Sequence, residues 1–205
     1  MIHSKRIQSG LPAMMAVVLF LAGWAGDGPR QLDFQPQTSI RIDGTSSLHD
    51  FSCTAEAVSG VMELSSTNAT NAAEALTALS VVNVDVPVGA IDCGNGTMDK
   101  KMRKALNAND APVVTYRMTG VEVEGEPDTE GFYALKTSGR LTIAGTERPI
   151  DMKVRGRQNP DGSFRFLGSQ KIRMSEFGIS PPSAMLGAVK TGDVVTVHFE
   201  VVTGS

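Results

Sequence analysis

Two segments in the C-terminal half alternate inward and outward side chains over about twelve residues each. They are residues 132–143 and 163–174. Period-two alternation is typical of a half-buried β-strand, and twelve residues span about 40 Å, roughly twice the usual strand length. The turn sequence Pro160-Asp161-Gly162 before the second segment predicts a hairpin. The chain is therefore constrained to an elongated antiparallel sheet.

The two faces of these segments differ in polarity. The mainly apolar faces carry Tyr133, Leu135, Thr137, Gly139, Leu141, Ile143, Phe164, Phe166, Gly168, Gln170, Ile172 and Met174. The charged faces, with that of the strand between them, carry Asp151, Lys153, Arg155, Arg157, Lys171 and Arg173. A lipid-facing surface could not hold such a row of charges cheaply. A membrane-spanning barrel is therefore excluded, and the apolar side points inward.

Gly139 and Gly168 lie halfway along the two inward faces. A glycine at such a position either admits a bend at a barrel corner or leaves an unfilled channel. Both interpretations stay open from the sequence.

Residues 98–106 are predicted to form the one short α-helix. Thr97 is suited to cap its N-terminus, because a threonine hydroxyl can accept a hydrogen bond from a free amide of the first turn. The apolar stripe of this helix consists of Met98, Met102, Ala105 and Leu106. Methionine suits both a core cap and an adaptable ligand contact. Residues 65–78 lack apolar periodicity and form either a loop or a weak helix.

Residues 195–201 alternate again, which predicts a terminal strand. An apolar loop stiffened by Pro181 and Pro182 precedes it, since consecutive prolines cannot continue a sheet ladder. Gly192 and Asp193 are expected to form a turn. We expect the terminal strand to close a barrel and the loop to lie across its mouth.

The first 25 residues have the order of a secretory signal. Lys5 and Arg6 make a basic start, an apolar run follows from residue 11 to 21, and small residues continue to Ala25. Cleavage after Ala25 and a periplasmic or secreted location are expected; an uncleaved anchor is the alternative. Residues 26–37 are expected to be a flexible lead-in, and residues 38–203 one domain.

Charge limits the partners of the exported chain. Without residues 1–25, 17 basic and 22 acidic residues remain, a net charge of −5. Scattered basic residues in an acidic chain predict no nucleic-acid partner. They also predict no basic cluster for an anionic lipid surface.

Cys53 and Cys93 are the only cysteines. In an exported protein an even number of cysteines favours a disulfide. Two buried thiols on separate strands are the alternative.

The sequence offers little for catalysis or metal binding. After the leader only His49 and His198 remain as histidines, and no nucleophile elbow, phosphate-binding loop or paired-cysteine motif is present. His49 and Asp50 are adjacent, so on a strand they would point to opposite faces. We therefore expect no catalytic residue, no metal site and no cofactor.

Four segments resemble, in order, the YceI-like family of secreted bacterial lipid-binding proteins. They are GTSSLHDF at 44–51, TMDKKMRKALNANDAPVVTY at 97–116, GRLTIAGTERPIDMKV at 139–154, and the terminal FGI, PP, LG and GDV elements between 177 and 194. The resemblance implies a lipocalin-like barrel around a polyisoprenoid or another long-chain amphiphile. It also implies a structural or mouth-lining role for His49.

We therefore expect an all-β protein, an extended lipocalin-like antiparallel β-barrel of about eight strands with one short α-helix. Its expected function is to carry or sequester a polyisoprenoid, a quinone-like molecule or a fatty-acyl amphiphile. The candidate lipid contacts are Phe51, Val82, Val84, Met102, Leu106, Tyr116, Met118, Leu141, Ile143, Phe164, Phe166, Gly168, Ile172, Phe177 and Leu186. His49 and Gln170 are the polar candidates at the mouth.

The expected partner is a long-chain amphiphilic lipid. A membrane donor or acceptor protein and a second copy of the chain are further candidates. Two other functions stay open: an enzyme or redox-linked helper of periplasmic electron transfer, and a structural exported domain without a ligand.

Overall fold

The structure is a computed structural model that describes residues 29–55, 57–184 and 189–204. In chain order its strands are β1 (Arg30–Asp33), β2 (Ser39–Ser46), β3 (Phe51–Ala55), β4 (Ser59–Leu64), β5 (Leu79–Pro87), β6 (Ile91–Asp92), β7 (Val113–Glu124), β8 (Tyr133–Ile143), β9 (Thr146–Gln158), β10 (Phe164–Arg173), β11 (Ser183–Ala184) and β12 (Val189–Val202). Its helices are α1 (Ala72–Thr77), α2 (Gly96–Ala105) and the short 3-10 helices η1 (Val88–Ala90) and η2 (Met174–Phe177). The predicted leader, residues 1–25, lies outside the described part of the chain.

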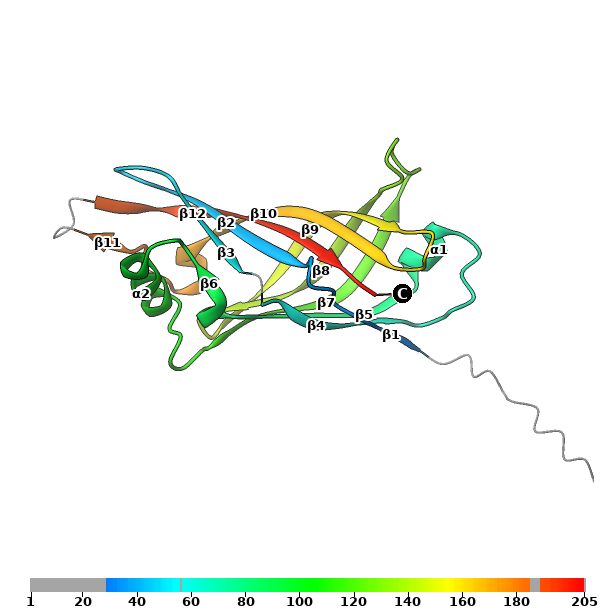
Figure 1. Cartoon of the computed structure of the whole chain (residues 1–205), viewed down its shortest axis with the longest axis horizontal. Coiled ribbons are helices and arrows are strands. Elements are labelled where there is room, and N and C mark those ends of the chain that lie inside the picture. Colours follow the sequence, from blue (N-terminus) through cyan, green and yellow to red (C-terminus); the bar gives the residue numbers. More distant parts are fainter. Residues whose placement is uncertain (1–28, 56, 185–188, 205) are drawn as a thin grey trace, which may run out of the picture.

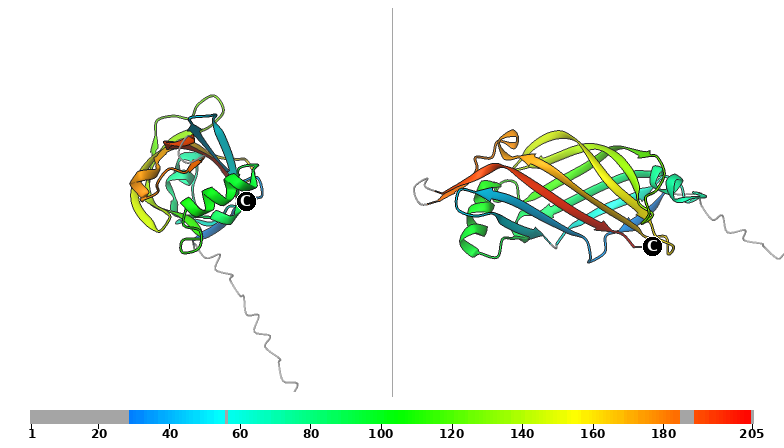
Figure 2. Two further views of the ribbon diagram at one scale, coloured as in Figure 1. Left: turned by 90° about the vertical axis from the view of Figure 1, so that its left-hand side faces the viewer. Right: turned by 90° about the horizontal axis from the view of Figure 1, so that it is seen from above.

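The strands form one antiparallel sheet that curls into an elongated tube (Figures 1 and 2). Its hydrogen-bonded order is β1-β4-β5-β7-β8-β9-β10-β12-β2-β3-β6, and β11 pairs with β12. The terminal strand β12 lies between β10 and β2, so it joins the C-terminal hairpins to the N-terminal half. The predicted all-β barrel is confirmed. The sheet has 12 strands rather than about eight, because β1, β6 and β11 are too short to show a period.

The long alternating segments form the wall as predicted. Strands β7, β8, β9 and β10 have 12, 11, 13 and 10 residues and pair in sequence order. Their charged faces point outward, where Arg155 lies 2.6 Å from Asp128 and 2.8 Å from Glu130. Such exposed pairs add little stability, so the wall is held mainly by its backbone ladder and its apolar interior.

The turn predicted at Gly192 and Asp193 is wrong. Both residues lie within β12, which starts at Val189, and the irregularity there is a register shift between Thr191 and Val195. The Asp193 carboxylate accepts hydrogen bonds from the Ser175 amide at 2.8 Å and from its hydroxyl at 2.7 Å. These bonds lower the pKa of Asp193 below its ordinary value and fasten η2 to the edge of the barrel.

Residues 30–33 of the predicted flexible lead-in form β1, which pairs with β4. Leu32 is only 2% exposed, and its burial explains why this part of the lead-in is ordered. The weak helix considered within residues 65–78 is present as α1, with Asn71 as its N-cap. In the described part of the chain, no helix has the length and hydropathy needed to cross a membrane.

Helix α2 begins earlier than predicted. Its N-cap is Asn95, whose side chain accepts hydrogen bonds from the amides of Thr97 and Met98, so the proposed Thr97 cap is wrong. The two extra residues fit because Asn95 takes the extended backbone that a cap requires. At the other end Asn107 has a φ of 53° and stops the helix.

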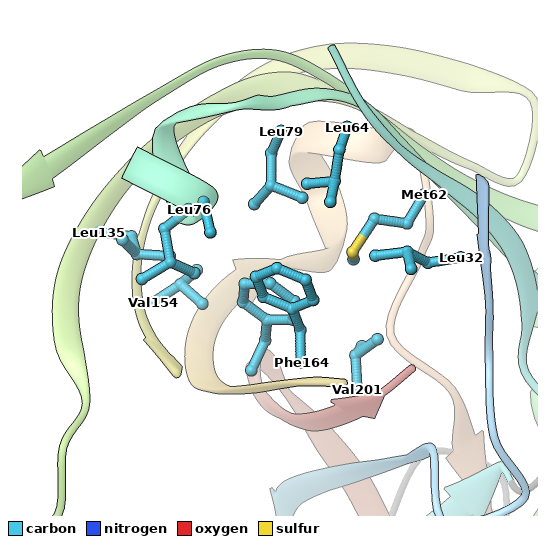
Figure 3. Close-up of a cluster of buried hydrophobic side chains, with 11 residues drawn as sticks. Leu32, Met62, Leu64, Leu76, Leu79, Leu135, Val154, Phe164 and Val201 are labelled. Carbon is cyan, nitrogen blue, oxygen red and sulfur yellow. The ribbon is translucent and has the colours of Figure 1, made fainter. Parts of the chain in front are cut away.

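One end of the tube is closed by a compact apolar cluster (Figure 3). Leu76 of α1 and Leu32 of β1 point toward the ring of Phe164 in this cluster. The remaining buried members are Met62, Leu64, Ala75, Leu79, Leu135, Val154, Phe166 and Val201. We call this set the floor cluster, because the space above it is the interior of the tube.

Candidate functional site

A cavity of about 880 Å³ occupies the tube above the floor cluster. Nearly every strand contributes to its wall, because each long strand turns alternate side chains inward. The predicted lipid contacts that line it are Phe51, Val82, Val84, Met102, Leu106, Tyr116, Met118, Leu141, Ile143, Phe166 and Ile172. The volume lies near the upper end of the range for small-molecule pockets.

The mouth lies at the end opposite the floor cluster. It is formed by the tip of the β2–β3 hairpin, by α2 and by the segment leading into β11 (Figure 1). His49 lies there, and its Nδ1 is 2.9 Å from the Asp50 carbonyl oxygen. Gln170 also lines the cavity but comes from the wall, opposite Val197 of β12.

Ionisable groups in the cavity wall gather at the mouth. His49, Asp50 and Lys101 are the lining residues that can carry charge near neutral pH, and all three belong to the hairpin tip or to α2. Tyr116 lies deeper; burial raises the pKa of its hydroxyl, so the group stays neutral. The interior is therefore a nonpolar tube with a charged rim.

Four predicted contacts do not line the cavity as the structure describes it. Phe164 is fully buried in the floor cluster. Phe177, the last residue of η2, is 4% exposed and packs with Ile172, Ile179 and Val195. Both are core residues, because their side chains are enclosed by protein on all sides. Leu186 lies outside the described residues, and Gly168 is covered by the Phe199 ring.

Gly168 leaves no open channel at its own position. A Cβ placed there would lie 2.3 Å from the Phe199 ring, its direct partner on β12. Gly139 is covered in the same way by Tyr116 of β7. In both cases the glycine gives an aromatic ring a place to lie flat on the sheet, a known device in barrels. The unfilled-channel interpretation of these two glycines is therefore wrong, and a bend at a barrel corner stays a prediction.

This packing predicts the effect of adding one methyl group at Gly168. Gly168→Ala should lower the free energy of unfolding by about 1–3 kcal/mol, because the Phe199 ring has to leave its place. Gly120→Ala is the matched control, since Gly120 has no atom within 4 Å of its would-be Cβ. Urea unfolding of both variants measures the difference. Equal midpoints would show that the Phe199 ring is not held against the glycine.

Many wall residues were not among the lipid contacts predicted from the sequence. They include Ile40, Ile42, Met62, Leu79, Val86, Ile91, Val114, Val121, Ile150, Met152, Val154, Met174, Val195, Val197, Phe199 and Val201. The alternation of β2, β7, β9 and β12 would have identified most of them, because their inward positions follow the same period as β8 and β10.

Cys53 of β3 and Cys93, just before α2, form a disulfide. The predicted pairing is confirmed, and the alternative of two separate thiols is wrong. Both residues line the cavity. The Cys93 amide also donates a hydrogen bond of 2.8 Å to the Asp99 carboxylate in the first turn of α2. The disulfide therefore ties the start of α2 to the barrel wall.

The fold and the cavity together define a lipocalin-like barrel with a nonpolar interior open at one end. The family model of the YceI-like domain matches residues 37–203. The chain belongs to this family, as the four sequence segments predicted. Comparison with curated proteins gives no match.

Solved structures share the fold at low sequence identity. Burkholderia cenocepacia BcnA is 17% identical with a TM-score of 0.60, covering 80% of this chain and 95% of its own. A polyisoprenoid-binding domain from Saccharophagus degradans is 11% identical with a TM-score of 0.62, covering 85% and 98%. The Campylobacter jejuni YceI protein is 19% identical with a TM-score of 0.54, covering 75% and 84%. At these identities the comparison supports the fold alone.

Proposed function

We propose that the protein holds one long-chain amphiphile, with its hydrocarbon tail in the barrel and its polar end at the mouth. The observation that carries this proposal is the 880 Å³ cavity, whose chargeable groups are confined to the rim. A tail gains roughly 0.8 kcal/mol for each buried methylene, so ten carbons contribute about 8 kcal/mol. The similar structure from Saccharophagus degradans, a polyisoprenoid-binding domain, supports a polyisoprenoid as the ligand. A quinone-like lipid or a fatty-acyl chain would use the same nonpolar tube.

The proposed role is carriage or sequestration rather than catalysis, in the periplasm or outside the cell. The leader at residues 1–25 supports export. A structural domain without a ligand is less well supported, because such a domain would fill its interior with side chains.

Native mass spectrometry of the protein purified from its own host tests the proposal. The expected result is a mass excess that disappears on organic extraction and that appears in the extract as one lipid class. A protein that carries no extractable lipid, and that binds no isoprenoid, quinone or fatty acid when these are added, would overturn the proposal.

Blocking the tube should abolish binding of long chains. Val84 lines the cavity from β5, and Val81, three residues earlier on the same strand, does not line it. Val84→Trp would exclude more than two methylenes of the tail, which weakens binding more than tenfold. Val81→Trp is the control, with the same substitution on the same strand. Fluorescent fatty-acid titration measures both, and equal affinities would contradict a tail running past Val84.

A further inference from the structure

Helix α2 lies across the mouth end of the barrel with two opposite faces (Figure 2). Met98, Met102 and Leu106 face the barrel, where they pack against the cluster around Cys53 and Ile91. At 100° per residue, the side chains of Lys100, Arg103 and Lys104 fall on the far side of the helix. The face of α2 that points away from the barrel is therefore basic.

These cations differ from most others in the protein. In the described chain, the basic side chains of α2 have no carboxylate within ion-pair distance, whereas Arg41, Arg117 and many other wall cations are paired. Lys100 and Lys104 are exposed. Their charge is thus available to a partner, although the whole chain has a net charge of −3.

Helix α2 carries four basic residues and one carboxylate, Asp99, so its own charge is positive. Asp92 accepts a hydrogen bond from the Gly94 amide, and Asp99 accepts one from the Cys93 amide. At the opposite side of the mouth Asp193 lies 3.5 Å from Arg173. Asp50 and Asp110 are exposed near this end, and the exposed Glu147 and Glu176 are ion-paired with Arg140 and Arg173.

A large apolar side chain is exposed at the same end of the barrel. Leu48, at the tip of the β2–β3 hairpin, is 68% exposed, the most exposed large hydrophobic residue in the described chain. It also belongs to the cavity mouth. A basic face and an exposed leucine at the same end of a molecule are a combination found on surfaces that lie at a membrane interface.

We propose that the mouth end of the barrel docks on an anionic bilayer. Lys100, Arg103 and Lys104 contact lipid phosphates, and Leu48 enters the headgroup region. This inference rests on the proposed lipid-binding function and adds where the lipid is exchanged. A hydrocarbon tail then passes from the bilayer into the tube without crossing water. Crossing water would cost roughly 0.8 kcal/mol for each exposed methylene.

Vesicle flotation of the purified protein tests the proposal. Phosphatidylcholine vesicles with phosphatidylglycerol should bind the protein, and vesicles of phosphatidylcholine alone should bind it much less. The double substitution Lys100→Gln and Lys104→Gln should weaken binding to the anionic vesicles about tenfold or more. Each basic residue near an anionic membrane surface adds substantially to the free energy of binding. High salt should have the same effect on the unchanged protein.

The matched control is the double substitution Lys136→Gln and Lys153→Gln. These two lysines are cross-strand partners on the outer wall, away from α2, and both are exposed. An equal loss in the control would overturn the proposal, since net charge alone would then explain binding. Equal binding to neutral and anionic vesicles would also overturn it, as would binding unaffected by the α2 substitutions, which would point to another surface.

A second measurement separates this inference from the proposed function. Fatty-acid affinity in the absence of vesicles should be unchanged by Lys100→Gln and Lys104→Gln, because neither residue lines the cavity. The rate at which the protein takes a fluorescent fatty acid from anionic vesicles should fall with vesicle binding. Normal fatty-acid affinity together with no vesicle binding would refute docking and leave lipid binding intact.

Discussion

Replacing Cys53 and Cys93 with alanine should lower the free energy of unfolding by about 4 kcal/mol. The disulfide closes a loop of 40 residues, and a loop of this length removes about that much chain entropy from the unfolded state. The loss should appear in urea unfolding as a lower midpoint. The double variant should also exchange fluorescent fatty acid faster, because α2 is no longer tied to β3 at the mouth.

The control is the unchanged protein under a dithiol reductant. It should lose the same stability as the double variant, and the reductant should not affect the double variant further. A double variant as stable as the parent would contradict the entropic account. A large loss of stability with unchanged ligand exchange would show that the hydrogen bonds of α2 hold the mouth without the disulfide.

The barrel wall could be predicted because its signal is local. The hairpins of β8, β9 and β10 follow one another, and each turn has its own glycine. Within each of these strands, the alternation of apolar and polar residues shows which side chains face inward. The pairing of β12 with β2 joins residues about 150 positions apart, and no local pattern specifies such a contact.

The sequence does not show how far along the tube each inward-facing side chain lies. Phe164, Phe166 and Gly168 share one face of β10, so alternation treats them alike. The structure separates them: Phe164 is enclosed within the floor cluster, Phe166 is a member of that cluster that also borders the cavity, and Gly168 lies under Phe199. That separation depends on α1 and β1, which fill one end of the tube.

Whole-chain composition does not show the basic face of α2. Counted over the chain, the basic residues are outnumbered and scattered. The helical period of α2 gathers Lys100, Arg103 and Lys104 on one face, because the opposite face is occupied by the methionines that pack on the barrel. A count over the whole chain therefore hides a local basic face.

The two phenylalanines of β10 give the sharpest test of where the cavity ends. Their rings are 6.0 Å apart and nearly parallel, yet Phe164 is enclosed by the floor cluster and Phe166 borders the cavity. Phe164→Ala should lower the free energy of unfolding by about 3–5 kcal/mol, because it leaves a void among packed side chains. Its affinity for a fluorescent fatty acid should stay within a few-fold of the parent.

Phe166→Ala is the matched comparison. Its cost in stability should be smaller, because one side of the ring already faces the cavity and the truncation enlarges an existing space. Its effect on ligand affinity should be larger, since the tail loses a ring that it contacts. Urea unfolding and fatty-acid titration on the same preparations decide between the roles. The reverse pattern, in which Phe164→Ala loses binding but keeps its stability, would place the end of the tail below the floor cluster and would make Phe164 a ligand contact after all.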